Sequence, residues 1–130
     1  ALESYGKNLG LAFQIADDAL DYFSTKTVFG KEIGKDFYEG KTTLPIIIIF
    51  QRANAEERNF LIEIFKKKER NEDDFSETLA LINKYKAVHA SFKRAEYFVN
   101  VSYDALGIFK DSKEKKILQN LTGFSLNRSF

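Results

Sequence analysis

Proline is nearly missing from this chain, and that is the strongest constraint on its fold. Pro45 is the single proline among 130 residues. Proline interrupts helices, whereas long stretches of this sequence repeat their apolar residues with the 3.6-residue period of an amphipathic helix. The sequence therefore predicts an all-α fold.

The periodic segments predict helices joined by one long loop and several short ones. The first helix is expected over residues 2–23, and a charged loop with several glycines follows over residues 24–43. Thr43, Leu44 and Pro45 have the residue order of a helix N-terminus. The β-branched run after them would also suit a buried strand, but no partner strand is apparent elsewhere. Further helices are expected over residues 54–70, 71–85, 87–109 and 112–130.

Size and charge narrow the class of protein. A length of 130 residues suits about one domain, so residues 1–130 are interpreted as one helical region. Apolar residues make up 44% of the chain, which is enough for a packed core. With 20 basic and 19 acidic side chains, the chain has no strong field for nucleic acid or a membrane surface. The longest apolar run, Leu44–Phe50, is far shorter than the ~20 residues of a transmembrane helix.

Three aspartates share one face of the first predicted helix. On a helical wheel Asp17, Asp18 and Asp21 lie on one stripe with Gln14, and apolar residues cover most of the remaining surface. Their repulsion costs little on a solvated face, but much more on a partly buried face without a cation. The stripe is therefore either a solvated acidic face or a site for Mg²⁺, which prefers carboxylate oxygens and often shares its shell with phosphate.

The loop after this helix favours the second interpretation. Lys31 and Lys41 each follow a glycine within GKEIGKDFYEGKTT. Glycine lets the backbone approach a ligand closely, and lysine is a compact point charge for phosphate. The aspartates and the Gly-Lys loop together suit a metal–diphosphate site, although glycine and lysine are also common in solvated loops.

Residues 6–46 resemble the second aspartate-rich region of the trans-isoprenyl diphosphate synthases. The segments GKNLGLAFQIADDALDYFS and GKEIGKDFYEGKTTLPIII match the pattern of that family, in order, at nearly every fixed position. The similarity is to the long-chain bacterial type, such as the octaprenyl diphosphate synthases. Thr42 departs from the pattern, because the bacterial enzymes often have proline there. The rest of the chain resembles the family only as a helical C-terminal portion.

The resemblance implies an all-helical isoprenoid synthase bundle, usually homodimeric and cytoplasmic. The implied reaction is the Mg²⁺-dependent condensation of isopentenyl diphosphate with an allylic diphosphate, in isoprenoid and quinone side-chain biosynthesis. The implied site comprises Asp17, Asp18 and Asp21 as metal ligands, Gln14, Lys31 and Lys41 as substrate-binding residues, and Asp36 as the residue that orders the loop.

The first aspartate-rich motif of the family is expected upstream of the second, and none precedes Asp17 in this sequence. The chain is therefore interpreted as the C-terminal part of a polyprenyl diphosphate synthase, a fragment or the product of a split or decayed gene. It is expected to be inactive until a complementary N-terminal half is supplied. The alternative is a non-catalytic subunit or remnant that binds a partner chain. A relative of the terpene cyclases fits less well, because of the EGKTTLP segment.

Three other polar features favour structural roles. Asp73 and Asp74 lie near the start of a predicted helix, where the helix dipole favours acidic side chains. His89 has no second histidine and no cysteine to pair with as a metal ligand. The basic run 66–70 suits a helix C-terminus, because it lacks the interleaved aromatic residues of a nucleic-acid site.

Overall fold

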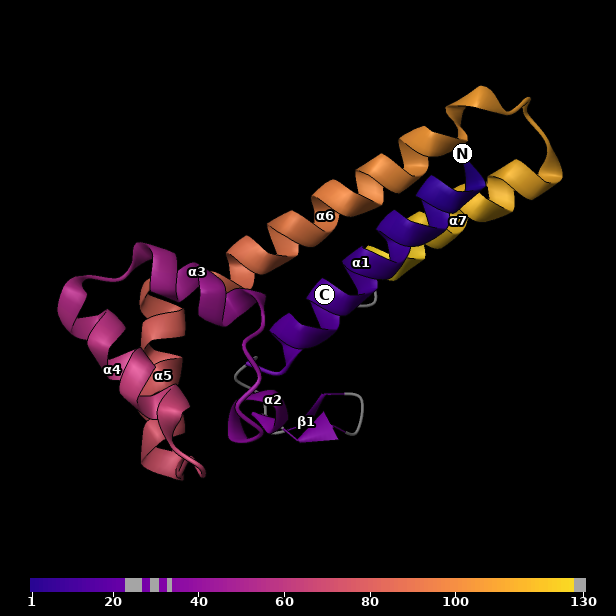
Figure 1. Ribbon diagram of the computed structural model, residues 1–130. Coiled ribbons are helices and arrows are strands. Elements are labelled where there is room, and N and C mark those ends of the chain that lie inside the picture. Colours follow the sequence, from indigo (N-terminus) through magenta and orange to yellow (C-terminus); the bar gives the residue numbers. More distant parts are fainter. Residues whose placement is uncertain (23–26, 29–30, 33, 128–130) are drawn as a thin grey trace. The chain divides into compact units, whose positions relative to one another are not determined.

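The computed structural model describes residues 1–22, 27–28, 31–32 and 34–127, with side chains for residues 1–22 and 34–122 (Figure 1). The predicted all-α fold is confirmed, since helices account for nearly all regular structure in this part of the chain. The α-helices are α1 (Leu2–Leu20), α2 (Lys35–Tyr38), α3 (Leu44–Arg52), α4 (Ala55–Lys66), α5 (Glu72–Lys84), α6 (Ala87–Ala105) and α7 (Lys113–Asn127).

Two shorter elements complete the description. A 3-10 helix, η1 (Leu106–Ile108), follows α6 directly. The strands β1 (Thr27–Val28) and β2 (Lys31–Glu32) form an antiparallel hairpin inside the segment expected to be a loop. None of the helices in the described segments is both long and apolar enough to cross a bilayer.

Three predicted helix ends differ from the structure within the described residues. Helix α6 ends at Ala105 instead of residue 109, and the 3-10 helix η1 follows it. Helix α1 ends at Leu20 instead of residue 23, so Asp21 and Tyr22 form a turn. Helix α4 ends at Lys66 instead of residue 70, because Lys67 has an extended backbone and the Arg70 guanidinium donates to carbonyls at this helix end. The β-branched run after Pro45 is helical, as predicted.

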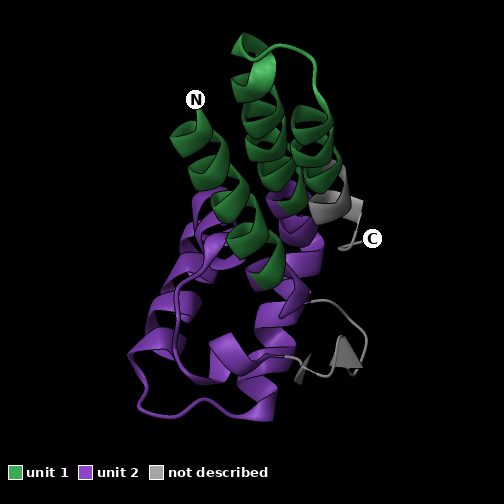
Figure 2. Ribbon diagram, turned by 90° about the vertical axis from the view of Figure 1, so that its right-hand side faces the viewer, with its two compact units in different colours: residues 1–17, 92–130 green, residues 18–91 purple. Residues whose placement is uncertain are grey.

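The chain divides into two compact units, whose boundaries fall within α1 and α6 (Figure 2). Unit 1 comprises residues 1–17 and 92–130, and unit 2 comprises residues 18–91. Each unit has a core of its own, so each is described separately.

Unit 1 is built on small side chains. Ala12, Ala95 and Val99 are buried where α1 and α6 pack together. Small residues at a helix contact let the two backbones approach closely. The Tyr5 hydroxyl donates a hydrogen bond of 2.8 Å to the carbonyl of Leu118, which ties α1 to α7.

Unit 2 has a core of large apolar side chains. Ile46, Ile48 and Ile49 of α3 are buried against residues of the neighbouring helices. Truncating a fully buried Ile49 to Ala is expected to cost about 2–5 kcal/mol of unfolding free energy. The largest fully buried apolar side chains of this core are Tyr22, Phe37, Ile49, Leu61 and Ile82.

Helices α4 and α5 begin with the same capping arrangement. The side chain of Asn54 accepts the N–H of Glu57 (2.8 Å), and the Asn54 N–H donates to the Glu57 carboxylate (3.0 Å). Asn71 and Asp74 repeat this pair at the start of α5. Both exchanges satisfy backbone donors that a helix N-terminus leaves unpaired.

Candidate functional site

The predicted acidic stripe lies at the C-terminal end of α1. Asp17 and Asp18 are consecutive residues of this helix, the first exposed and the second partly buried. Asp21 follows in the turn after the helix and is only 1% exposed. No group of three His, Cys, Asp or Glu side chains close enough to hold a metal ion occurs among the residues described. The metal role of the three aspartates stays a prediction.

The carboxylate of Asp21 accepts hydrogen bonds from two backbone N–H groups of α2. The Lys35 N–H donates to Oδ1 (3.1 Å), and the Asp36 N–H donates to Oδ2 (2.8 Å). The Gly34 N–H also donates to the carbonyl of Asp21 (2.9 Å). Glycine at the N-cap of α2 has no side chain to accept these donors, so Asp21 supplies the missing cap from 14 and 15 residues away.

Gly34 makes this approach possible. Its φ of 84° lies in the left-handed region, which glycine enters at little cost. A Cβ at this position would lie 2.9 Å from the Phe75 ring and 3.2 Å from the Tyr38 ring. Both the backbone conformation and the close contact therefore require glycine here.

Lys41 follows α2 and keeps most of its side chain in solvent. Its N–H donates to the carbonyl of Asp36 (2.9 Å), which fixes the backbone. Its ammonium lies 3.8 Å from the Asp36 carboxylate and 3.6 Å from that of Glu39, and the side chain is 61% exposed. Exposed pairs at such distances are weak, so the ammonium can exchange these carboxylates for another anion. The structure thus places Asp36 between Asp21 and Lys41.

Arg70 holds the other end of α2, a role that the sequence did not predict. Its Nε donates to the carbonyl of Phe37 (2.9 Å), and Nη1 donates to the carbonyl of Lys67 (2.7 Å). Gly40, with a φ of 77°, lies so close that a Cβ there would be 2.8 Å from Nη2 of Arg70. The glycine before Lys41 signalled a close approach, but nothing in the sequence named the partner.

Two hydroxyl groups are buried in this region. Tyr22 is 1% exposed, and the oxygen atoms of its hydroxyl and of the Thr43 hydroxyl are both buried. Burial raises the pKa of the tyrosine, and the carboxylates of Asp21, Asp36 and Asp18 raise it further, in that order. The phenol therefore stays protonated at neutral pH. The described carboxylates and hydroxyls of this region are hard oxygen groups, which suit Mg²⁺ or Ca²⁺ better than a transition metal.

Gln14 and Lys31 are the remaining predicted site residues. Gln14 is exposed on α1, one turn before Asp17 and Asp18. Lys31 belongs to β2, and its side chain lies outside the described part. Their predicted contacts with substrate stay predictions.

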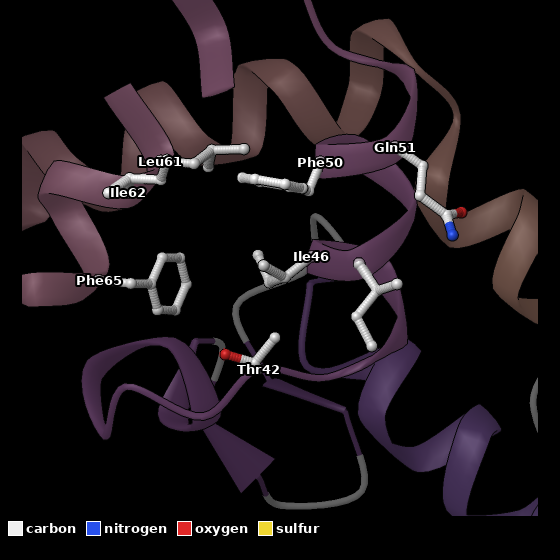
Figure 3. A pocket seen from close by; sticks show the side chains of 8 residues that line it. Thr42, Ile46, Phe50, Gln51, Leu61, Ile62 and Phe65 are labelled. Carbon is white, nitrogen blue, oxygen red and sulfur yellow. The ribbon is translucent and has the colours of Figure 1, made fainter. Parts of the chain in front are cut away.

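An apolar groove of about 420 Å³ runs between α3 and α4 of unit 2 (Figure 3). Ile46 and Phe50 of α3 lie opposite Leu61 and Phe65 of α4 in this view. Phe50 is 40% exposed, and Ile47 and Ile62 on the rim are exposed to a similar degree. The lining residues among those described are apolar apart from Thr42 and Gln51, and none of them is charged.

Comparisons with known proteins support the family resemblance inferred from the sequence motifs. The family model for polyprenyl synthetase matches residues 1–82. Octaprenyl diphosphate synthase from Haemophilus influenzae is 33% identical over 130 residues, which are 100% of this chain and 39% of that protein. A short chain isoprenyl diphosphate synthase from Methanothermobacter thermautotrophicus is 34% identical over 98% of this chain and 39% of its own length.

Solved structures show the same similarity. A polyprenyl synthase from Caulobacter crescentus, solved with calcium and isoprenyl diphosphate, gives a TM-score of 0.87 at 36% identity, over 99% of this chain and 39% of that chain. A decaprenyl diphosphate synthase from Rhodobacter capsulatus gives a TM-score of 0.87 at 31% identity, over 98% of this chain and 39% of that chain. The chain thus spans about two-fifths of the length of these relatives. It belongs to the polyprenyl synthetase family.

Proposed function

We propose that this chain is the part of an octaprenyl-type trans-polyprenyl diphosphate synthase that binds the allylic diphosphate. The observation that supports this most is the contact between the end of α1 and the segment from Gly34 to Lys41. Through Asp21 the acidic end of α1 is joined to a turn that carries an exposed lysine. Carboxylates for a cation and an ammonium for a phosphate are thereby placed on connected elements.

The donor set fits a hard divalent cation. The motif of Asp17, Asp18 and Asp21 supplies carboxylate oxygens, the ligands that Mg²⁺ prefers. When bound, Mg²⁺ would stabilise the negative charge that develops on a departing diphosphate. The calcium and isoprenyl diphosphate in the Caulobacter crescentus relative support a divalent cation in this family.

The side chains of this chain bind and orient the substrate in the proposal. Lys41, with its exposed ammonium, pairs with diphosphate oxygens, and Lys31 does the same from the hairpin. Gln14 faces the allylic group from one turn before the aspartates. The backbone carbonyl of Asp36 keeps the backbone of Lys41 in place by accepting its N–H.

Condensation with isopentenyl diphosphate needs more than these residues. Because the chain spans about two-fifths of its relatives, the first aspartate motif and the second substrate site are assigned to a complementary N-terminal half. The 130-residue chain alone is then inactive, and a mixture with such a half is active. Absence of turnover in the mixture, despite complex formation, would instead favour the non-catalytic subunit.

The binding part of the proposal is tested by thermal unfolding. Mg²⁺ and inorganic pyrophosphate together should raise the melting temperature more than either alone, because each compensates the charge of the other. The double variant Asp17→Asn with Asp18→Asn should lose this joint effect. Asp73→Asn, an exposed acid on α5, is the matched control and should keep it. An undiminished joint effect in the double variant would place the site elsewhere.

A further inference from the structure

We propose that Asp21 is a positioning residue of this site and that the cation is left to Asp17 and Asp18. The Asp21 carboxylate would hold the N-terminus of α2 and, through α2, the lysine that receives the diphosphate. The inference rests on the proposed function and divides the aspartate motif by role. It also revises the prediction that all three aspartates bind metal alike.

The end of α1 separates Asp21 from the stripe. A residue four positions after Asp17 lies on the same helix face only while the helix continues. Because α1 ends at Leu20, Asp21 belongs to a turn and not to that face. It is 1% exposed, whereas Asp17 is exposed and Asp18 partly so. The three carboxylates therefore do not share one environment.

Both carboxylate oxygens of Asp21 already serve the backbone. Oδ1 accepts the Lys35 N–H and Oδ2 accepts the Asp36 N–H, at 3.1 and 2.8 Å. A bidentate contact of this kind fixes direction as well as distance. The Gly34 N–H on the Asp21 carbonyl adds a third link between the same two segments.

Helix α2 depends on such external partners. It has four residues, and an isolated helix of that length does not form in water. Asp21 holds its first turn, and Arg70 holds its last through the carbonyl of Phe37. The N–H of Lys41 donates to the carbonyl of Asp36, a residue whose own N–H is held by Asp21. Release of Asp21 would thus free the backbone that leads to the lysine.

Substitutions at Asp21 separate the two roles. Asp21→Ala leaves the two N–H groups of α2 without an acceptor. Asp21→Asn keeps one oxygen acceptor but turns an amide donor toward the other N–H, so it should restore part of the anchor. The double variant Asp17→Asn with Asp18→Asn leaves the anchor intact and removes the proposed cation ligands.

The experiment uses the 130-residue chain, with amide hydrogen exchange and Mn²⁺ broadening measured by NMR. In Asp21→Ala the amides of Lys35 and Asp36 should exchange roughly ten- to a hundredfold faster, as expected for the loss of a charge-assisted hydrogen bond. Broadening by Mn²⁺ at residues 16–19 should be retained, and binding of inorganic pyrophosphate should weaken. The Asp17 and Asp18 double variant should show the reverse pattern, with normal exchange and no broadening.

Loss of broadening in Asp21→Ala to the same extent as in the double variant would overturn the proposal, as would unchanged exchange at Lys35 and Asp36. If Asp21→Ala loses its helical circular dichroism, the same two measurements are made on Asp21→Asn. The amide exchange rates of Lys35 and Asp36 in this variant should lie between those of the alanine variant and those of the unmodified chain. Failure of the unmodified chain to bind either Mn²⁺ or pyrophosphate would overturn the proposed function. The exchange result at Lys35 and Asp36 would still decide whether Asp21 is the anchor.

Discussion

Two acidic clusters in this chain occupy opposite ends of their helices. Glu72, Asp73 and Asp74 lie in the first turn of α5, where unpaired N–H groups and the helix dipole favour negative charge. Asp17 and Asp18 lie in the last turn of α1, which has no basic residue and where the dipole disfavours negative charge. The helix dipole therefore accounts for the acidic cluster of α5 but not for that of α1.

Asp74 of α5 and Asp21 after α1 differ in how far along the chain their hydrogen-bond partners lie. Asp74 accepts the N–H of Asn71 (3.0 Å) and pairs with the Lys67 ammonium (2.6 Å), so its partners lie within a few residues. These two contacts, the lysine first, hold the pKa of Asp74 below its usual value. Asp21 finds its partners 14 and 15 residues further along the chain. The contacts of Asp74 are therefore local in the sequence, whereas the contacts of Asp21 join it to a second segment.

The largest expected effect on stability comes from substituting Asp21. Asp21→Ala should lower the free energy of unfolding by about 2–4 kcal/mol, because one buried and one partly buried N–H group lose a charged acceptor. Asp73→Ala should change it by less than about 0.5 kcal/mol, since the side chain is exposed. Urea unfolding followed by circular dichroism measures both. Equal, small losses in the two variants would show that the Asp21 contacts contribute little to stability.

Gly34 gives the next largest effect. Gly34→Ala should cost about 1–3 kcal/mol, because the residue has a positive φ and its Cβ would press on the Phe75 ring. Gly6→Ala is the control, because it lies in α1 with open space around it and should stabilise by up to about 1 kcal/mol. The measurement is again urea unfolding. A neutral Gly34→Ala would mean that the α2 turn can shift away from Asp21 without loss.

The sequence predicted the clusters well but not their environments. Helical period and the Thr43–Pro45 start are local signals, and the structure confirms the helices they predicted. The end of α1 was missed because residues 21–29 contain no glycine or proline and the apolar pattern continues to Phe23. The contacts of Asp21 and Arg70 join distant segments, so no local pattern could have revealed them. The sequence motifs predicted the candidate site, but they did not show which aspartate holds the backbone of α2.

A smaller effect is the loss of stability at acid pH that comes from a carboxylate at the N-terminus of α4. Hydrogen bonds from Lys84, then Tyr85 and the Asn54 N–H, lower the pKa of Glu57 from 4.5 to about 2. Since the folded-state pKa lies below the unfolded one, this stabilisation is complete above about pH 5 and is lost as the pH falls towards 2. Glu57→Gln should therefore flatten the fall in the urea midpoint over this range. Glu63→Gln, an exposed acid on the same helix, should not, and an equal slope in both variants would contradict the assignment.

The smallest expected effect is a change in stability that should have opposite signs for the two acidic clusters. Without divalent cations and at low salt, Asp17→Asn with Asp18→Asn should stabilise the chain by about 0.3–1 kcal/mol, because two like charges leave the unfavourable end of α1. Glu72→Gln with Asp73→Asn should destabilise it by a similar amount, because the same change is made at the favourable end of α5.

Both differences in this test should shrink at high salt, since Asp17, Glu72 and Asp73 are exposed and Asp18 is only partly buried, so that salt screens these charges. Added Mg²⁺ should reverse the first difference only, because the unmodified chain gains a ligand that the α1 double variant cannot bind. Thermal unfolding in a matrix of salt and Mg²⁺ concentrations separates these cases. A response to Mg²⁺ that is the same in both double variants would show that the two acidic clusters do not differ in function, however different their positions on the helices.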